Sequence, residues 1–134
     1  MATTIFTKII NGEIPAWKVA ENDNYLAFLD IFPVAKGHTL VIPKKEVDYI
    51  FDLEPETYAG LHEFTRKVAI GLKKAIPCQK VGTVVLGLEV PHAHIHLVPM
   101  KTEADLLNFG KKLKFTKEEF EEIRDKISAE IKLR

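Results

Sequence analysis

The chain has 134 residues, 46% of them hydrophobic and 28% charged, a composition typical of one globular domain with a single core. Its 19 Lys and Arg residues balance 19 Asp and Glu residues, which argues against a protein that coats a nucleic acid polymer, because that binding mode needs clustered cations. The lone cysteine, Cys78, excludes an internal disulfide and fits a reducing compartment. Without a signal-peptide pattern or a long apolar run, we expect a cytoplasmic protein that has no membrane partner.

Strands and helices are predicted from apolar periodicity and from the Pro, Gly and Asn residues at the breaks. In chain order they are an amphipathic segment at 4–11, strands at 17–20, 25–30 and 38–42, a helix at 55–75, strands at 81–86 and 92–98, and a tail helix at about 116–133. The tail helix begins with a capping box, in which Thr116 is followed three residues later by Glu119. Five strands with local connections and two separated helices predict an α+β fold with an antiparallel sheet, in one domain that spans residues 1–134.

The segment 91–99 contains three histidines, His92, His94 and His96, which alternate with apolar residues. We call these three the triad. Alternate residues of a strand share one face, so the three rings are expected side by side, about 6–7 Å apart. A purely structural cluster would need a partner for every buried ring nitrogen, so a functional role is the better interpretation. Two chemistries fit the residues: a metal site, or an imidazole that attacks phosphorus while its neighbours hydrogen-bond the oxyanion.

Three blocks before the triad resemble the successive motifs of a known family. They are residues 4–16 (TIFTKIINGEIPA), 27–33 (AFLDIFP) and 37–45 (GHTLVIPKK), and with the triad they cover about residues 4–100. The chain thus resembles the histidine triad (HIT) family, and within it the Hint-like branch of nucleoside phosphoramidate hydrolases. The resemblance implies a HIT-like fold, which has a five-stranded antiparallel sheet with a central helix, followed here by the C-terminal extension and its helix.

The same resemblance implies a nucleotide-binding hydrolase that cleaves nucleoside monophosphate derivatives, such as phosphoramidates of the AMP-lysine type, at the α-phosphate. His94 would be the nucleophile and would form a covalent nucleotidyl-histidine, while His96 and His38 would contact the phosphate. His92 would order the ring of the nucleophile. Asp30 would hold the ribose hydroxyls, a role that suits a carboxylate acceptor. The purine would lie among five apolar residues, each of which could equally be ordinary core: Phe6, Ile9, Ile14, Ile31 and Leu40.

The chain departs from some bacterial relatives that carry a zinc site. Their ligands, two cysteines and two histidines, correspond here to Thr4, Thr7, Glu46 and His92. Three of the four ligands are therefore absent together, and neutral threonine hydroxyls cannot replace thiolates. We expect no structural zinc, no other metal and no cofactor.

A second departure lies at residues 87–90, where the family usually has Gly-Gln-Ser-Val and this chain has Gly-Leu-Glu-Val. Our hypothesis is that Glu89 donates a proton to a leaving amine or contacts it, although a solvated surface charge is an equally good interpretation. Leu88 replaces a glutamine that orients the leaving group, which counts against the alternative of a dinucleoside polyphosphate hydrolase. A nucleotide- or partner-binding protein with little catalysis is a further alternative.

Members of the Hint-like branch form homodimers whose sheets join, so the resemblance also implies a homodimer. The apolar stripe Leu61, Phe64, Val68 and Leu72 on the helix at 55–75 could serve the core of one chain or that interface. The tail helix could shape the leaving-group side of the site or extend the dimer contact. The sequence leaves both choices open.

Overall fold

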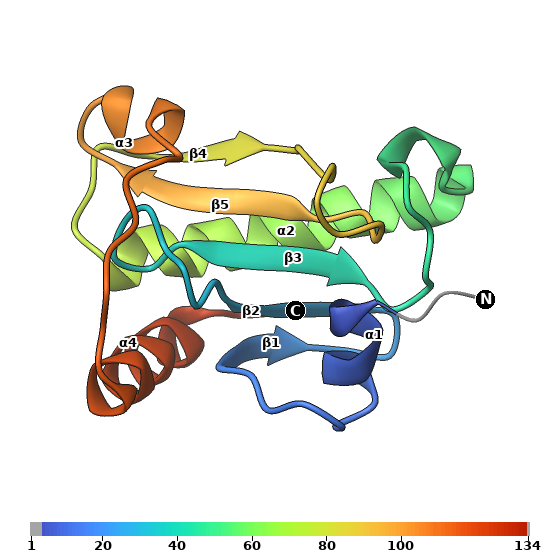
Figure 1. Cartoon of the computed structure of the whole chain (residues 1–134), viewed down its shortest axis with the longest axis horizontal. Coiled ribbons are helices and arrows are strands. Elements are labelled where there is room, and N and C mark those ends of the chain that lie inside the picture. Colours follow the sequence, from blue (N-terminus) through green and yellow to red (C-terminus); the bar gives the residue numbers. More distant parts are fainter. Residues whose placement is uncertain (1–3, 134) are drawn as a thin grey trace.

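Five antiparallel strands form one sheet in the computed structural model, which describes residues 4–133 (Figure 1). The strands are β1 (Lys18–Glu21), β2 (Tyr25–Leu29), β3 (Thr39–Pro43), β4 (Lys80–Val84) and β5 (Ile95–Met100). Their order across the sheet is β1-β2-β3-β5-β4, and every neighbouring pair is antiparallel. The predicted α+β class with a five-stranded antiparallel sheet is therefore confirmed.

The helices divide between the two faces of the sheet. They are α1 (Ile5–Ile10), a 3₁₀ turn (Ile50–Asp52), α2 (Pro55–Ala75), α3 (Ala104–Leu107) and α4 (Lys117–Glu130). Figure 1 shows α2 behind the sheet and α1 in front of it. The predicted capping box at Thr116 is present, whereas α3 and the 3₁₀ turn are too short for periodicity to predict. Among the described residues, no helix has the length and apolar character that a membrane crossing requires.

Alternation along the strands builds one apolar layer on each face. On the α2 face, Ala27, Leu29 and Val41 pack against the predicted helix stripe: Leu61, Phe64, Val68 and Leu72. Each residue of that stripe is at most 3% exposed, so the stripe belongs to the core of this chain. On the opposite face, a second cluster contains Phe6 and Ile9 from α1 with four strand residues: Leu26, Phe28, Leu40 and Ile42.

The tail helix α4 lies on the α2 face. Phe120, Ile123 and Ile127 are buried in the larger cluster, and the indole of Trp17 stacks on Phe120 with ring centroids 6.0 Å apart. His96 pairs with Leu40 across β3 and β5 and so projects from the other face, the one that carries α1. Helix α4 therefore does not line the triad in this chain; the segment that precedes it does, as described below.

The predicted strand at 92–98 is wrong at its start, because β5 begins only at Ile95. The N–H of His92 bonds to the carbonyl of Val90 at 2.8 Å, and the N–H of Ala93 bonds to the carbonyl of Val47 at 2.7 Å. Both donors thus bond to loops rather than to a neighbouring strand. Only the third triad histidine lies in a strand, and the first two lie in the loop that enters it.

Candidate functional site

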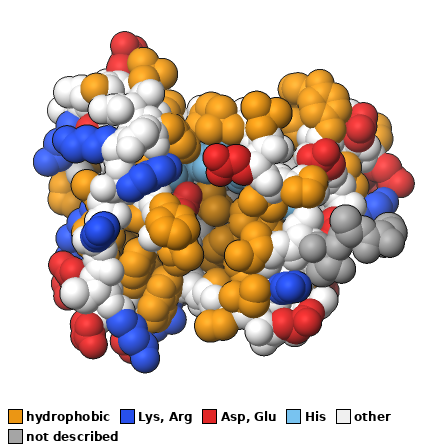
Figure 2. All heavy atoms as spheres, viewed as in Figure 1, with side chains coloured by type: hydrophobic (Ala, Val, Ile, Leu, Met, Phe, Trp, Pro, Cys, Tyr) orange, Lys and Arg blue, Asp and Glu red, His pale blue; other side chains and the backbone are white. Residues whose placement is uncertain are grey.

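The face of the sheet that carries α1 also carries the histidines. Figure 2 shows them in the middle of this face, between hydrophobic side chains and with Lys and Arg side chains gathered to one side. A hollow of about 450 Å³ lies elsewhere, and its walls include Lys36, Ile76 and Lys111. None of the four histidines His38, His92, His94 and His96 lines it. The candidate site is therefore defined by side chains that converge on the α1 face.

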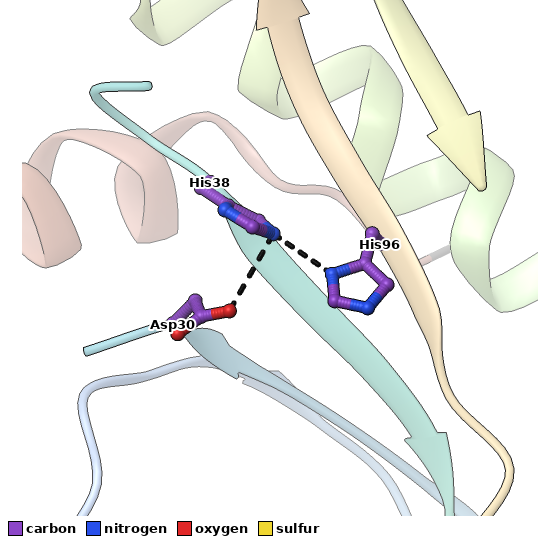
Figure 3. Close-up of side chains that lie close together, drawn as sticks. All are labelled: Asp30, His38 and His96. Carbon is purple, nitrogen blue, oxygen red and sulfur yellow. Dashed lines mark hydrogen bonds and ion pairs between the residues drawn. The ribbon is translucent and has the colours of Figure 1, made fainter. Parts of the chain in front are cut away.

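Three side chains, one in a strand and two at the ends of neighbouring strands, meet at the centre of the site (Figure 3). Asp30 follows β2, His38 precedes β3, and His96 lies in β5. The Nε2 atom of His38 is 2.9 Å from Nδ1 of His96 and 3.6 Å from Oδ2 of Asp30. A turn at Gly37 positions His38. Glycine suits this turn because φ is +90° and because a Cβ here would lie only 3.0 Å from the Ile76 side chain.

Hydrogen bonds fix which ring nitrogens carry protons. The backbone N–H of Val34 donates to Nδ1 of His38 at 3.1 Å, so the proton of this neutral ring sits on Nε2. That Nε2–H then donates to Nδ1 of His96. Consequently the proton of His96 lies on its own Nε2, which is free to donate to a ligand.

His94 has the opposite tautomer. Its Nδ1–H donates to the backbone carbonyl of His92 at 2.8 Å, which leaves a lone pair on Nε2. The rings of His94 and His96 are 4.9 Å apart, centroid to centroid. Within residues 4–133 no buried side-chain nitrogen or oxygen lacks a partner, so both of these Nε2 atoms reach the surface. The site thus presents a nucleophilic lone pair beside an N–H donor.

His92 does not share that surface, which corrects the expected row of three rings. It is fully buried; its Nε2–H donates to the carbonyl of Pro43 at 2.8 Å, and its Nδ1 lies 3.1 Å from the hydroxyl of Thr4. Both ring nitrogens are therefore occupied. The contribution of His92 to the site is its carbonyl, which holds the ring of His94.

The four positions compared with zinc ligands do come together, but hydrogen bonds join them. The Thr7 hydroxyl donates to Glu46, the Thr7 N–H donates to the Thr4 hydroxyl at 3.1 Å, and that hydroxyl also contacts His92. Two neutral hydroxyls and one carboxylate are not a zinc donor set of the usual nitrogen and sulfur type. These residues do not fit the zinc site of the bacterial relatives.

Burial dominates the electrostatics of the histidines. It lowers the pKa of His38 to about 4 and that of His96 to about 3, and it also lowers the pKa of His92 and His94. The carboxylate of Asp30 opposes this effect at His38 and His94 without overcoming it. All four rings are therefore neutral at pH 7, as a nucleophilic imidazole must be.

These lowered pKa values predict a loss of stability in mild acid. The unfolded chain takes up protons on histidine near pH 6.5, whereas folded His38 and His96 do not, so the free energy of unfolding should fall as pH decreases from 6.5 to 5. Each such histidine contributes up to about 1.4 kcal/mol per pH unit. Urea denaturation at several pH values measures this slope, and a flat profile across the window would contradict it. Most of the titration of the carboxylates lies below this window, so they contribute little to the slope.

Asp30, His38 and His96 each offer an atom within 4.8 Å of the others, close enough together for a divalent cation. The hydrogen-bond directions oppose such a ligand set. A metal needs the lone pair of His38 Nε2, but Val34 already directs an N–H at Nδ1, so the ring proton has to stay on Nε2. The proton arrangement of this cluster suits an anion better than a cation.

The apolar residues expected near the purine lie in two settings. Phe6, Ile9 and Leu40 are buried together, and Ile14 packs against their cluster. The ring of Phe6 is 5.0 Å from that of His94, so this cluster borders the His94 ring. Ile31 is outside the cluster and 56% exposed, next to Asp30. Asp30 accepts the N–H of Phe32 on one carboxylate oxygen and directs the other toward His38.

Glu89 lies on the loop between β4 and β5 and is exposed. Its neighbour Leu88 is 96% exposed and presents no polar group. Next to these two, Val90 packs against the cluster that contains Phe6. This packing anchors the loop beside the triad, and the role of Glu89 stays a hypothesis.

Sequence reasoning missed Phe109 and Lys112. The Phe109 ring meets the rings of His96 and His38 edge-on, at centroid distances of 5.1 and 5.7 Å. Lys112 lies over the Phe109 ring, with Nζ 5.0 Å from the centroid. The segment has neither apolar periodicity nor a motif, so no sequence signal could have assigned it to the site.

The chain is similar to known proteins over nearly its whole length. A family model described as HIT domain matches residues 11–103. Adenosine 5'-monophosphoramidase hnt1 of Schizosaccharomyces pombe is 37% identical over 131 residues, which cover 96% of this chain and 98% of that protein. An uncharacterized HIT-like protein of Borreliella burgdorferi is 35% identical over an alignment of 139 residues, gaps included, which covers 98% of this chain and 100% of that protein.

Solved structures show the same fold. A Hit-like protein from Bartonella henselae superposes with a TM-score of 0.83 at 34% identity, covering 96% of this chain and 97% of that one. A Zn-bound histidine triad family protein from Mycobacterium smegmatis gives a TM-score of 0.78 at 28% identity, covering 95% and 94%. The predicted family resemblance and HIT-like fold are thereby confirmed.

Proposed function

The chain belongs to the HIT family of nucleotide-binding proteins and hydrolases, and on that premise we propose that it hydrolyses phosphoramidates of nucleoside monophosphates at the α-phosphate. The observation that carries the proposal is the pair of opposite tautomers at His94 and His96. One ring offers a lone pair to phosphorus, and the other offers an N–H to a phosphate oxygen.

The proposed reaction has two displacements at phosphorus. The Nε2 lone pair of His94 forms a bond to the α-phosphorus while the bond from phosphorus to the leaving amine breaks, and the amine takes up a proton as it departs. The N–H of His96 bonds the oxygen on which negative charge grows. Water then attacks phosphorus and gives up a proton, while the bond from phosphorus to Nε2 of His94 breaks and its electron pair returns to that nitrogen. No cofactor is needed for this sequence.

The nucleoside is proposed to bind beside the histidines. Asp30 would accept ribose hydroxyls with the carboxylate that borders His38. The purine would lie against the apolar side chains named from the resemblance: Phe6, Ile9, Ile14, Ile31 and Leu40. The position of Phe6 against the ring of His94 supports this assignment, because it joins the apolar cluster to the nucleophile.

Substrate comparison tests the proposal. Adenosine phosphoramidate should be hydrolysed with a higher kcat/KM than a diadenosine polyphosphate, because apolar Leu88 has no group to bond a polyphosphate leaving group. The reverse preference would favour a dinucleoside polyphosphate hydrolase. Tight AMP binding without turnover of either substrate would favour a nucleotide-binding protein.

Replacing Glu89 with Gln tests the leaving-group hypothesis. If the carboxyl group protonates or contacts the departing amine, kcat for an AMP-lysine-type substrate should fall by about 10²-fold, the usual size of one acid–base contribution. A substrate with a good leaving group that needs no proton should be hardly affected. An unchanged rate with the AMP-lysine-type substrate would show that Glu89 is only a surface charge.

A cytoplasmic homodimer completes the proposal. Strand β4 is an edge of the sheet, and the exposed Val85 and Leu86 follow it directly. An edge strand of this kind can pair with its counterpart in a second copy and so join two sheets. Sedimentation of the purified chain measures the assembly, and a monomer at micromolar concentration would contradict it. The single cysteine, Cys78, fits the reducing compartment.

A further inference from the structure

The candidate site has a charge deficit. A phosphate ester group is an anion, yet the four histidines are neutral at pH 7 because burial lowers the pKa of each. Asp30 adds a negative charge only 3.6 Å from His38. A cation from outside the triad and its strands would therefore strengthen the binding of an anion here.

Lys112 is in position to supply that charge. Its Nζ lies 5.0 Å from the centroid of the Phe109 ring, which itself meets the rings of His96 and His38 edge-on. The positive charge of Lys112 also contributes to lowering the pKa of both of these histidines, after the larger effect of burial. Its electrostatic influence therefore reaches the pair of rings at the centre of the site.

Backbone hydrogen bonds hold this segment against the sheet. The N–H of Leu113 donates to the carbonyl of Pro33 at 2.7 Å, and the N–H of Lys111 donates to the carbonyl of Asn108 at 3.1 Å. The first bond ties the segment to the loop that also carries His38. The second closes a turn, so Phe109 and Lys112 are presented together.

We propose that Lys112, supported on the ring of Phe109, is a substrate-binding residue whose ammonium group pairs with the phosphate of the bound nucleotide. The proposal deepens the proposed function, because it identifies the group that recognises the anionic part of the same substrate. The adjacent Lys111 differs in setting: it lines the separate hollow and is not stacked on Phe109. Lys111 therefore provides a matched control of the same charge and almost the same place in the chain.

Equilibrium binding of AMP and of adenosine tests the pairing, because the two ligands differ only in the phosphate. Lys112→Gln should weaken AMP binding about fivefold and leave adenosine binding unchanged, as expected for an ion pair lost from an exposed lysine. Lys112→Arg, which keeps the charge, should stay within about twofold of the natural chain. Lys111→Gln should bind both ligands as the natural chain does.

Salt supplies a second readout of the same pairing. The affinity of the natural chain for AMP should decrease as KCl rises, and this decrease should be smaller in Lys112→Gln. Equal losses for AMP and adenosine, or the same loss in Lys111→Gln as in Lys112→Gln, would overturn the proposal. Because the readouts are equilibrium affinities, they stand even if the chain turns over no phosphoramidate, and the two proposals fail separately.

Discussion

Replacing His94 with Asn is expected to lower kcat for adenosine phosphoramidate by about 10⁴-fold or more, the usual effect of removing a covalent nucleophile. In the structure, the Nδ1–H of His94 donates a hydrogen bond to the carbonyl of His92, so Nε2 is the nitrogen of this ring that has a free lone pair. An amide nitrogen has no comparable lone pair. Steady-state and single-turnover kinetics measure the effect.

The control for this variant is nucleotide binding. Because Asn preserves a short polar side chain that can donate to the carbonyl of His92, the fold and the affinity for AMP should be retained. A rate within about tenfold of the natural chain would mean that His94 is not the nucleophile. Loss of AMP binding together with rate would point instead to a misfolded site.

Replacing His96 with Phe is expected to lower kcat about 10²- to 10³-fold, the usual effect of removing one donor to a developing negative charge. The same change leaves the Nε2–H of His38 without its acceptor, in a residue that is only 1% exposed. An orphaned buried donor costs about 1–3 kcal/mol of unfolding free energy. Kinetics and urea denaturation should therefore both respond.

A second variant separates these two effects. The double variant His38→Leu with His96→Phe removes both partners of their hydrogen bond, although His38→Leu also takes away the acceptor of the Val34 N–H. The loss of unfolding free energy in the double variant should therefore be smaller than the sum of the losses in the two single variants. The catalytic rate should not return, because the N–H donor is still missing. If the losses of unfolding free energy in the two single variants simply add in the double variant, then the pairing of the two rings is wrong.

Local patterns of apolar residues predicted most of the strands and the two long helices, for physical reasons. The nearly continuous apolar runs of β2 and β3 reflect a sheet buried on both faces, and the stripe that includes Leu61 and Leu72 reflects one helix face packed on it. These signals are strong because each is repeated over many residues. The family blocks added the pairing of His38 with the triad, a contact between residues 58 positions apart that no local pattern contains.

The sequence did not predict features that depend on a single hydrogen bond or on the path of a long loop. Alternation placed all three triad rings on one strand, but Ala93 bonds to Val47 in a distant loop, and this bond delays the start of β5. The contribution of Phe109 depends on how segment 107–113 folds back over the sheet. Such a contact is decided by tertiary packing, and neither composition nor periodicity contains it.

A covalent bond between phosphorus and Nε2 of His94 is the central feature of the proposed mechanism. The direct measurement is rapid quenching of the chain with adenosine phosphoramidate, followed by mass spectrometry of its peptides. A transient adenylyl group should appear on the peptide that contains residues 92–96, fragment to His94, and be absent from His94→Asn. Product formation with no adduct during the first turnover, or an adduct on another side chain, would contradict the mechanism.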